Sequence, residues 1–240
     1  MDRDRRTALY AGLWFIGTFA FSIPGGILHL PLVDEPNYVV GAGSDTVVAL
    51  GSFLEILTAI AGIATAVVLY RIVRRASESV AIGYVALRTV ESVIIIVGLI
   101  SLMAVVALRQ DFAEATGAES TLYVTVSKGL VAIHSWTAVL GPAYCAGFGN
   151  GILLGYLMFR SGLVPRPWAM FGMAAGTLAF ATATAVLFGA FERDTALSTI
   201  GIFPEIVWEA FLGIYLTFKG FRPSPILREA SAEAARYRSP

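Results

Sequence analysis

Long apolar stretches separated by short polar connections dominate the chain. Six of them have about the 20 residues that an α-helix needs to cross roughly 30 Å of hydrocarbon, at residues 7–28, 47–70, 80–108, 136–159, 168–191 and 200–218. The pattern predicts an all-α fold, a polytopic six-helix transmembrane bundle over residues 1–221 with a short basic tail at 222–240. The longest connections are 29–46 and 109–135, and we expect the second to hold a short helix on the membrane surface.

The composition supports a lipid-covered surface. Of 240 residues, 57% are hydrophobic and 14% are charged, and the mean hydropathy is +0.74. Soluble domains carry roughly 25% charged residues, so this chain has too few charges to coat a water-exposed surface. Basic and acidic residues balance at 17 each, which offers nothing for nucleic acid as a partner. The bilayer itself is the first expected partner.

The basic residues predict the orientation, because Lys and Arg in short loops favour the cytoplasmic side. Thirteen of the 17 fall at the ends or connections on one side of the six spans, and three (Arg109, Lys128 and Arg193) fall on the other. We therefore expect both termini in the cytoplasm. Lysine occurs only twice while Arg, Ala, Gly and Val are frequent, which suggests a GC-rich bacterial genome and hence the bacterial cytoplasmic membrane.

Small residues predict where the helices pack, since membrane helices associate through close contact of small side chains. Two glycine series recur at helical spacing, and each could meet a neighbouring helix or join two copies of the chain as a homo-oligomer. They are Gly147, Gly151 and Gly155 in the fourth span and Gly172 and Gly176 in the fifth. Pro142, one turn inside the fourth span, is expected to kink that helix or mark its ragged outer end.

Four charges lie well inside the predicted spans, and intramembrane charges are functional-site hypotheses by default. They are Glu55, Arg88, Glu91 and Glu209. Counted from the span ends at about 1.5 Å per residue, all four fall in a layer about 6 Å thick near mid-membrane. Arg88 and Glu91 are spaced to pair on one helical face. Asn150 is a further buried polar group, and Glu205, which shares a stripe with Glu209, is a secondary candidate.

Two uncompensated carboxylates would be costly in this layer if every group were ionised. Either a carboxyl takes up a proton, or a cation or cationic small ligand binds there. The polar cluster is therefore predicted to be a proton- or cation-linked binding site. The alternative is architectural: Arg88–Glu91 is a static ion pair, and the other carboxyls are protonated donors that join the helices.

Other chemistry has little support in the sequence. His29 and His134 fall toward the outer side and are secondary candidates for a haem or metal site, but no Cys or carboxylate accompanies them at ligand spacing. No phosphate loop, nucleophile elbow or zinc-protease signature occurs. We therefore predict no catalytic residue, no resident metal and no cofactor, and an enzyme is the weakest class.

Several segments together resemble a family of bacterial multi-span membrane proteins, the domain of unknown function 4386. In the first half these are Phe53-Leu54-Glu55 and Ala81-Ile82-Gly83-Tyr84-Val85 with Arg88 and Glu91. In the second half they are His134, Trp136-Thr137, Leu140-Gly141-Pro142, Asn150, Leu154-Gly155-Tyr156-Leu157, the run from Arg160 to Arg166, Pro204, Glu209 and Lys219-Gly220-Phe221. The resemblance implies a multi-span fold, and its recurring polar positions map onto Glu55, Arg88, Glu91, Asn150 and Glu209. It implies no activity.

Two functions remain open from the sequence. One is a small proton- or cation-linked transporter or channel, for which three spans on each side of the long outer connection allow two halves of opposite orientation. The other is a non-enzymatic membrane component that senses a lipid, a quinone or a partner protein.

Overall fold

The computed structural model confirms an all-helical chain with six helices long and apolar enough to cross a membrane. It describes residues 3–35, 38–40, 43–112, 119–193 and 195–228. The first three spans are α1 (Arg3–Val33), α2 (Asp45–Val73) and α3 (Glu78–Phe112), with a 3₁₀ turn η1 (Tyr38–Val40) before α2. The last two are α6 (Arg166–Leu187) and α7 (Ala196–Phe218). The fourth span is one long helix of four parts: α4 (Glu119–Ala138), η2 (Val139–Cys145), η3 (Gly147–Leu154) and α5 (Gly155–Ser161).

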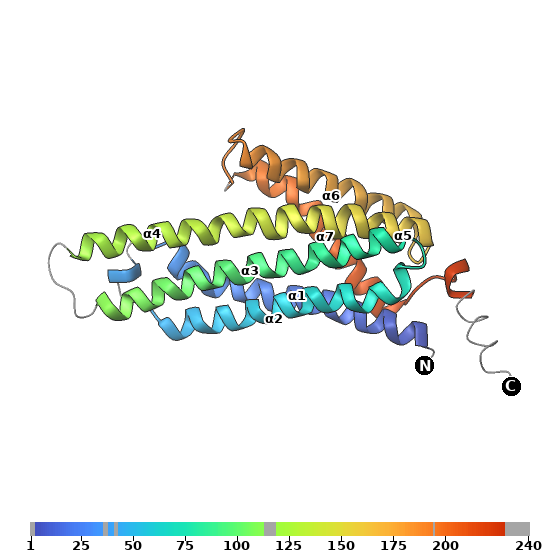
Figure 1. Ribbon diagram of the computed structural model, residues 1–240, viewed down its shortest axis with the longest axis horizontal. Coiled ribbons are helices and arrows are strands. Elements are labelled where there is room, and N and C mark those ends of the chain that lie inside the picture. Colours follow the sequence, from blue (N-terminus) through green and yellow to red (C-terminus); the bar gives the residue numbers. More distant parts are fainter. Residues whose placement is uncertain (1–2, 36–37, 41–42, 113–118, 194, 229–240) are drawn as a thin grey trace.

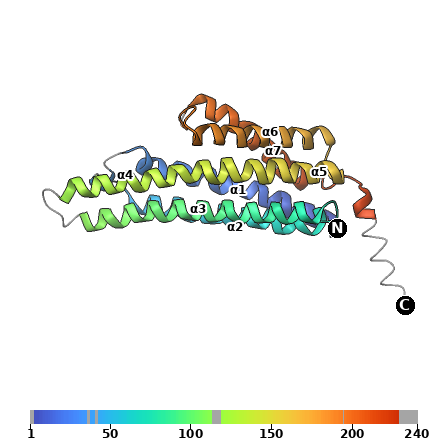
Figure 2. The ribbon, with the colours of Figure 1, turned by 45° about the horizontal axis from the view of Figure 1, so that its top comes forward.

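The spans form a closed ring in chain order. Each of the first four packs on the next, α6 packs on η3 and α5, and α7 packs on both α6 and α1. Figures 1 and 2 show α1 to α5 running side by side along the long axis, with the α6–α7 hairpin laid across them as a tilted layer. The ring matters for function because polar residues on its inner faces are shielded from lipid.

Both described chain ends lie at the same end of the bundle (Figure 1). Arg5 ties them together by donating hydrogen bonds to the carbonyls of Leu216 (3.2 Å) and Thr217 (2.7 Å) at the end of α7. The two short turns after α2 and α5 also lie there, and so do most of the arginines. We call this end the basic end and the opposite one the acidic end.

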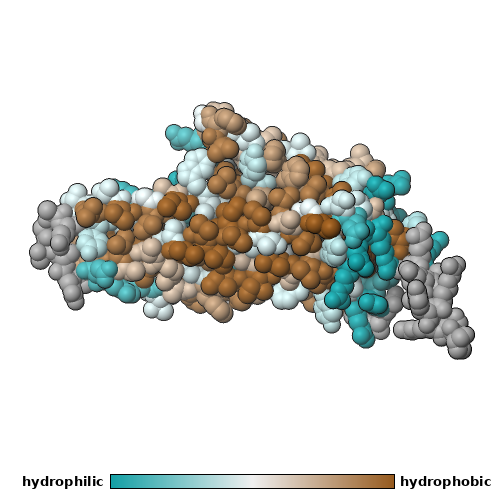
Figure 3. Space-filling view, viewed as in Figure 1, coloured by the Kyte–Doolittle hydropathy of each residue, from teal (hydrophilic) through white to brown (hydrophobic). Residues whose placement is uncertain are grey.

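The surface between the two ends is apolar. In Figure 3 hydrophobic residues cover the middle of the molecule, and hydrophilic ones gather over the basic end. Large apolar side chains stand exposed along the spans, including Ile100 (64%), Ile200 (65%) and Phe218 (73%). Since water would penalise such exposure and lipid would not, the structure is that of a multi-pass membrane protein.

The glycine series of the fourth and fifth spans meet each other inside the chain. A Cβ added to Gly147 would lie 3.0 Å from the Gly176 carbonyl oxygen, and one added to Gly151 would collide with Gly176 itself. Gly172 is covered by the Trp208 ring of α7. These faces are therefore occupied within one chain, and a second copy would have to use another surface.

The connection 109–135 differs from the expected one. The predicted surface helix is wrong: α3 continues to Phe112, and α4 begins at Glu119 and runs straight into the fourth span. Polar residues such as Ser127 and Lys128 lower the hydropathy of this stretch, which is why the sequence pattern excluded it. The helix persists because Leu130 and Val131 pack against the apolar cluster that includes Leu102, Val105 and Val106.

Pro142 does not end the fourth span, and the helix continues through it as a π-helix. Two consecutive π-helical segments, η2 and η3, replace the α-helical pattern from Val139 to Leu154, with a single residue between them. The wider turn accommodates a proline ring that has no N–H to give to an α-helical ladder. Such segments are rare and frequently occur at functional sites.

Candidate functional site

Arg88 and Glu91 form an ion pair on the inner face of α3. The Arg88 Nη1 atom lies 2.8 Å from Glu91 Oε2, and the two residues are only 3% and 7% exposed. Arg88 Nε also donates to the Gly62 carbonyl of α2 at 3.4 Å. Gly62 leaves room for this contact, since a Cβ there would come within 3.2 Å of the guanidinium. The pairing predicted from the spacing of the two residues is therefore present.

Glu209 reaches the same arginine from α7. Its Oε1 atom lies 3.6 Å from Arg88 Nη1 and accepts a hydrogen bond from Asn150 Nδ2 of η3. Asn150 is fully buried, and its main-chain carbonyl oxygen accepts a hydrogen bond from the Trp208 indole N–H at 3.0 Å. The third, fourth and sixth spans thus converge on one polar cluster, made of Arg88, Glu91, Asn150, Glu205 and Glu209.

Glu205 has the least compensated carboxyl in this cluster, although the sequence indicated it only as a secondary candidate. It lies one turn before Glu209 on α7 and is 3% exposed. Neither carboxylate oxygen has a hydrogen-bond partner among the described residues. A Cβ added to Gly151 of the π-helix would lie 2.6 Å from Glu205 Oε2, so the glycine makes the space that the carboxyl occupies.

The cluster holds more acid than base. Arg88 faces three glutamates, Glu91, Glu205 and Glu209, so full ionisation would leave two uncompensated negative charges. Burying a single unpaired charge costs several kcal/mol even after relaxation of the protein (about 3–5 kcal/mol). The arrangement therefore favours uptake of a proton or binding of a cation at the centre of the ring.

Glu55 does not join this cluster. Its Cγ and Oε1 atoms lie at the α1–α2 seam, each 3.1 Å from where a Cβ on Gly25 would be. No ion pair or hydrogen bond links it to another described residue. The depth estimate put Glu55 at the level of Arg88, but Arg88 meets α2 about two turns farther along, at Gly62. The neighbour that the Glu55 carboxyl meets is α1 instead of α3.

The two histidines meet near the acidic end. Their rings are in perpendicular contact with centroids 5.8 Å apart, and His29 Nε2 lies 3.2 Å from the Ser52 hydroxyl. His29 is 2% exposed, and His134 packs over Gly98 of α3. The described part of the chain has no group of three or more His, Cys, Asp or Glu side chains placed to hold a metal ion.

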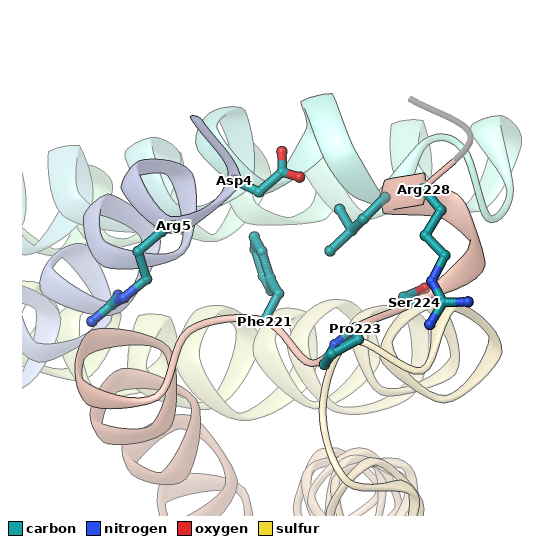
Figure 4. Close-up of a pocket in the computed structure, with 7 residues that line it drawn as sticks. Asp4, Arg5, Phe221, Pro223, Ser224 and Arg228 are labelled. Atoms are coloured by element: carbon teal, nitrogen blue, oxygen red, sulfur yellow. The ribbon is translucent and has the colours of Figure 1, made fainter. Parts of the chain in front are cut away.

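A separate cavity of about 490 Å³ opens at the basic end (Figure 4). It is lined by Asp4, Arg5, Phe221, Pro223, Ser224, Leu227 and Arg228. In Figure 4 Arg5 turns away from the cavity, in keeping with its bonds to the end of α7. The tail begins here, docked by the Arg222 amide on the Leu163 carbonyl and by Ser224 on the Ser161 carbonyl. The cavity is therefore separate from the charged cluster, and most of the predicted tail 222–240 lies outside the described residues.

One family profile matches the chain over residues 10–220, and its description is "Domain of unknown function (DUF4386)". The match covers the six spans and every residue of the charged cluster. No curated protein and no solved structure matches the chain.

Proposed function

The chain belongs to the family described as domain of unknown function DUF4386, and from its buried charges we propose that it is a small proton-linked membrane transporter. The cluster of Arg88, Glu91, Asn150, Glu205 and Glu209 is its central site. In this proposal a carboxyl of the cluster binds a proton in one state of the ring and releases it in another. A small cation is the other ligand that the charge balance admits.

Glu205 is the observation that carries the proposal. A protein that used these groups only to join helices would be expected to give each buried carboxyl a donor, because an unsatisfied buried polar group costs about 1–3 kcal/mol. Glu91 and Glu209 have donors, whereas Glu205 has none among the described residues. A carboxyl in that situation is stable when it carries a proton or faces a bound cation.

The π-helix supports a site that changes conformation. Asn150 and Gly151, which touch Glu209 and Glu205, both lie in η3. A π-helical segment can revert to α-helix by a shift of its hydrogen bonds, and such a shift would rotate the residues that follow along the span. A movement of this kind would alter the contacts of both glutamates at once.

A non-enzymatic membrane component that senses a lipid, a quinone or a partner is the second candidate. It is favoured by an apolar groove of about 500 Å³ on the outside of α6 and α7. Trp168 and Phe211 stack there with ring centroids 4.2 Å apart, and Lys219 lies in the lining. This groove would suit a lipid or a ring-bearing ligand, and it lies on the helix that carries Glu205 and Glu209.

The charge distribution supports a proposed localisation. The basic end, with both termini, would lie in the cytoplasm by the positive-inside rule. The arginine-rich composition supports a bacterial cytoplasmic membrane as the location.

Proton flux into proteoliposomes tests the proposal. Purified protein is reconstituted with a pH-sensitive dye inside, and a potassium diffusion potential drives proton entry. Wild type is expected to acidify the interior faster than protein-free liposomes. The Glu205→Gln and Glu209→Gln substitutions are expected to slow this acidification about 100-fold.

Glu78→Gln is the control, since Glu78 is an exposed residue at the start of α3. Wild-type flux no faster than that of empty liposomes would refute the proposal. If a candidate ligand then raises the thermal stability of the protein without flux, the sensing function replaces it.

A further inference from the structure

We propose that His29, His134 and Glu55 form the proton route that joins the acidic end of the bundle to the charged cluster. This inference rests on the proposed function. It assigns a role to three titratable residues that the cluster does not contain, of which His29 is buried and His134 and Glu55 are half-buried. It makes Glu55 the relay between the histidines and Arg88–Glu91.

The residues along α2 that contact these groups give the relative depths of the groups in the bundle. Gly51 lies against the His29 ring, so a Cβ at Gly51 would be 2.8 Å from His29 Nε2. Glu55 follows one turn deeper. Ala59 is a turn deeper again and accepts a hydrogen bond from Ser92 at 3.0 Å, and Gly62 then meets Arg88. Successive levels are therefore about 4.5–6 Å apart, and none is without a polar group.

The first level is the histidine pair. His29 comes from α1 and His134 from α4, and each covers a glycine of the opposing helix, Gly51 and Gly98. Ser52 and Thr137 add hydroxyl groups at the same level, because Ser52 meets His29 and Thr137 covers Gly98. Two imidazoles in ring contact can pass a proton between them through the adjacent hydroxyls or a bridging water.

Glu55 occupies the gap between that pair and the cluster. Side chains on a helix lean toward its N-terminus. Since α1 and α2 run in opposite directions, the Glu55 side chain leans toward the acidic end and the His29 side chain leans toward the cluster. Their approach is flanked by two glycines, Gly25 and Gly51, and a Cβ on Gly25 would lie 3.1 Å from Glu55 Oε1 and 3.3 Å from the Gly51 carbonyl. These glycines give the α1–α2 seam its room at this level.

The acidic end of the route is closed by two layers. Nearest the histidines is the apolar cluster of Leu32, Tyr38, Val48, Leu102, Val105 and Val106. Beyond it, Asp45 of α2 accepts hydrogen bonds from Tyr38 and Arg109, and the Arg109 guanidinium lies 5.2 Å from the centre of the Tyr38 ring. Separation of α2 from α3 at this end would therefore admit water to the histidines.

Each transfer conserves atoms and charge. A histidinium N–H bond breaks as an O–H bond forms on the Glu55 carboxylate, which leaves a neutral imidazole and a neutral carboxyl. The Glu55 O–H bond then breaks as one forms on a carboxylate of the cluster, which regenerates the Glu55 anion. Water bridges each step, because the histidines and Glu55 are about one helical turn apart, and Glu55 and the level of Arg88 are about two turns apart. Both separations exceed the reach of a direct hydrogen bond.

The proteoliposome flux assay separates this inference from the proposed function. Glu55→Gln, the double variant His29→Gln/His134→Gln and Glu209→Gln are compared with wild type. The matched control is Thr58→Val, because Thr58 is buried about one turn from Glu55 on α2 and its hydroxyl bonds only within its own helix. Glu55→Asp keeps a titratable group at the relay position, and elution as a single species by size-exclusion chromatography confirms that each variant is folded.

The route predicts that Glu55→Gln lowers the flux about 100-fold, that Glu55→Asp restores part of it, and that Thr58→Val leaves it unchanged. Wild-type flux in Glu55→Gln together with slow flux in Glu209→Gln would overturn the route and leave the proposed function standing. Equal losses in Glu55→Gln and Thr58→Val would overturn the relay role as well. Absence of flux in wild type would overturn both proposals.

Discussion

Arg88 of α3 and Glu209 of α7 approach each other to 3.6 Å at the centre of the helical ring. The same guanidinium also pairs with Glu91 and bonds to α2, so it joins three of the six spans. A single arginine therefore contacts two glutamates and holds the ring closed around them. Glu205 lies beside this pair and receives no hydrogen bond from it, which makes the cluster unbalanced.

Loss of the arginine is predicted to destabilise the protein strongly. Arg88→Ala would leave Glu91 and Glu209 buried without their cation, and removal of one partner from a buried pair costs about 3–5 kcal/mol. The free energy of unfolding, measured by denaturant titration in detergent micelles, should fall by that amount. Arg71→Ala is the control, because Arg71 lies exposed at the basic end of α2. Equal stability of the two variants would show that Arg88 is not the central cation.

The two glutamates of α7 should respond differently to removal of their charge. Glu209→Gln weakens the contact with Arg88 and is predicted to cost about 1–3 kcal/mol. Glu205→Gln replaces a carboxyl that has no donor among the described residues, so its stability should equal or exceed that of wild type. Thermal unfolding of both variants in the same detergent checks the order. Greater loss in Glu205→Gln would mean that Glu205 is compensated in the folded protein.

A methyl group at Gly151 is predicted to disturb the site. Its Cβ would collide with Gly176 and approach Glu205, and overpacking of this kind costs about 1–3 kcal/mol. Gly129→Ala is the matched control, since Gly129 lies inside α4 and a Cβ there meets nothing within 4 Å. That substitution should stabilise the helix by about 0.5–1 kcal/mol. Thermal unfolding midpoints that shift in the same direction for both variants would contradict the packing.

Much of the fold could be predicted because the bilayer imposes length and cost on each span. Six apolar stretches gave six helices, and the spacing of Arg88 and Glu91 gave their ion pair. Helical rise also predicted that Glu209 lies at the level of Arg88, and the two side chains approach to 3.6 Å. These properties depend on residues near one another in the chain, and so a single sequence contains them.

The neighbours of each helix could not be predicted in the same way. The sequence put Glu55 at the depth of Glu209, yet Glu55 lies about two helical turns along α2 from Gly62, which meets Arg88. Its carboxyl meets α1 because Gly25 and Gly51 bring those two helices together. Glu205 was only a secondary candidate. Its position one turn from Glu209 on the same face was the signal for it. The π-helix at Asn150 depends on packing against Trp208 and Gly176, and helical periodicity does not reveal it.

The orientation of the bundle can be tested with single cysteines in a Cys145→Ala background. Ser79→Cys lies at the basic end and Asp111→Cys at the acidic end, both exposed. A membrane-impermeant maleimide added to intact cells should label Asp111→Cys and leave Ser79→Cys unlabelled until the cells are opened. The reverse labelling would place the basic end and both termini outside the cytoplasm.

The central claim is that the carboxyl cluster binds and releases a proton, and infrared difference spectroscopy of the purified protein during a pH titration tests it most directly. The account predicts a carbonyl-stretch band of a protonated carboxyl that disappears as the pH rises while the protein stays folded. The band should be lost in Glu205→Gln and retained in the exposed control Glu78→Gln. A spectrum in which no carboxyl band changes with pH, or in which the change survives in Glu205→Gln, Glu209→Gln and Glu91→Gln alike, would contradict it.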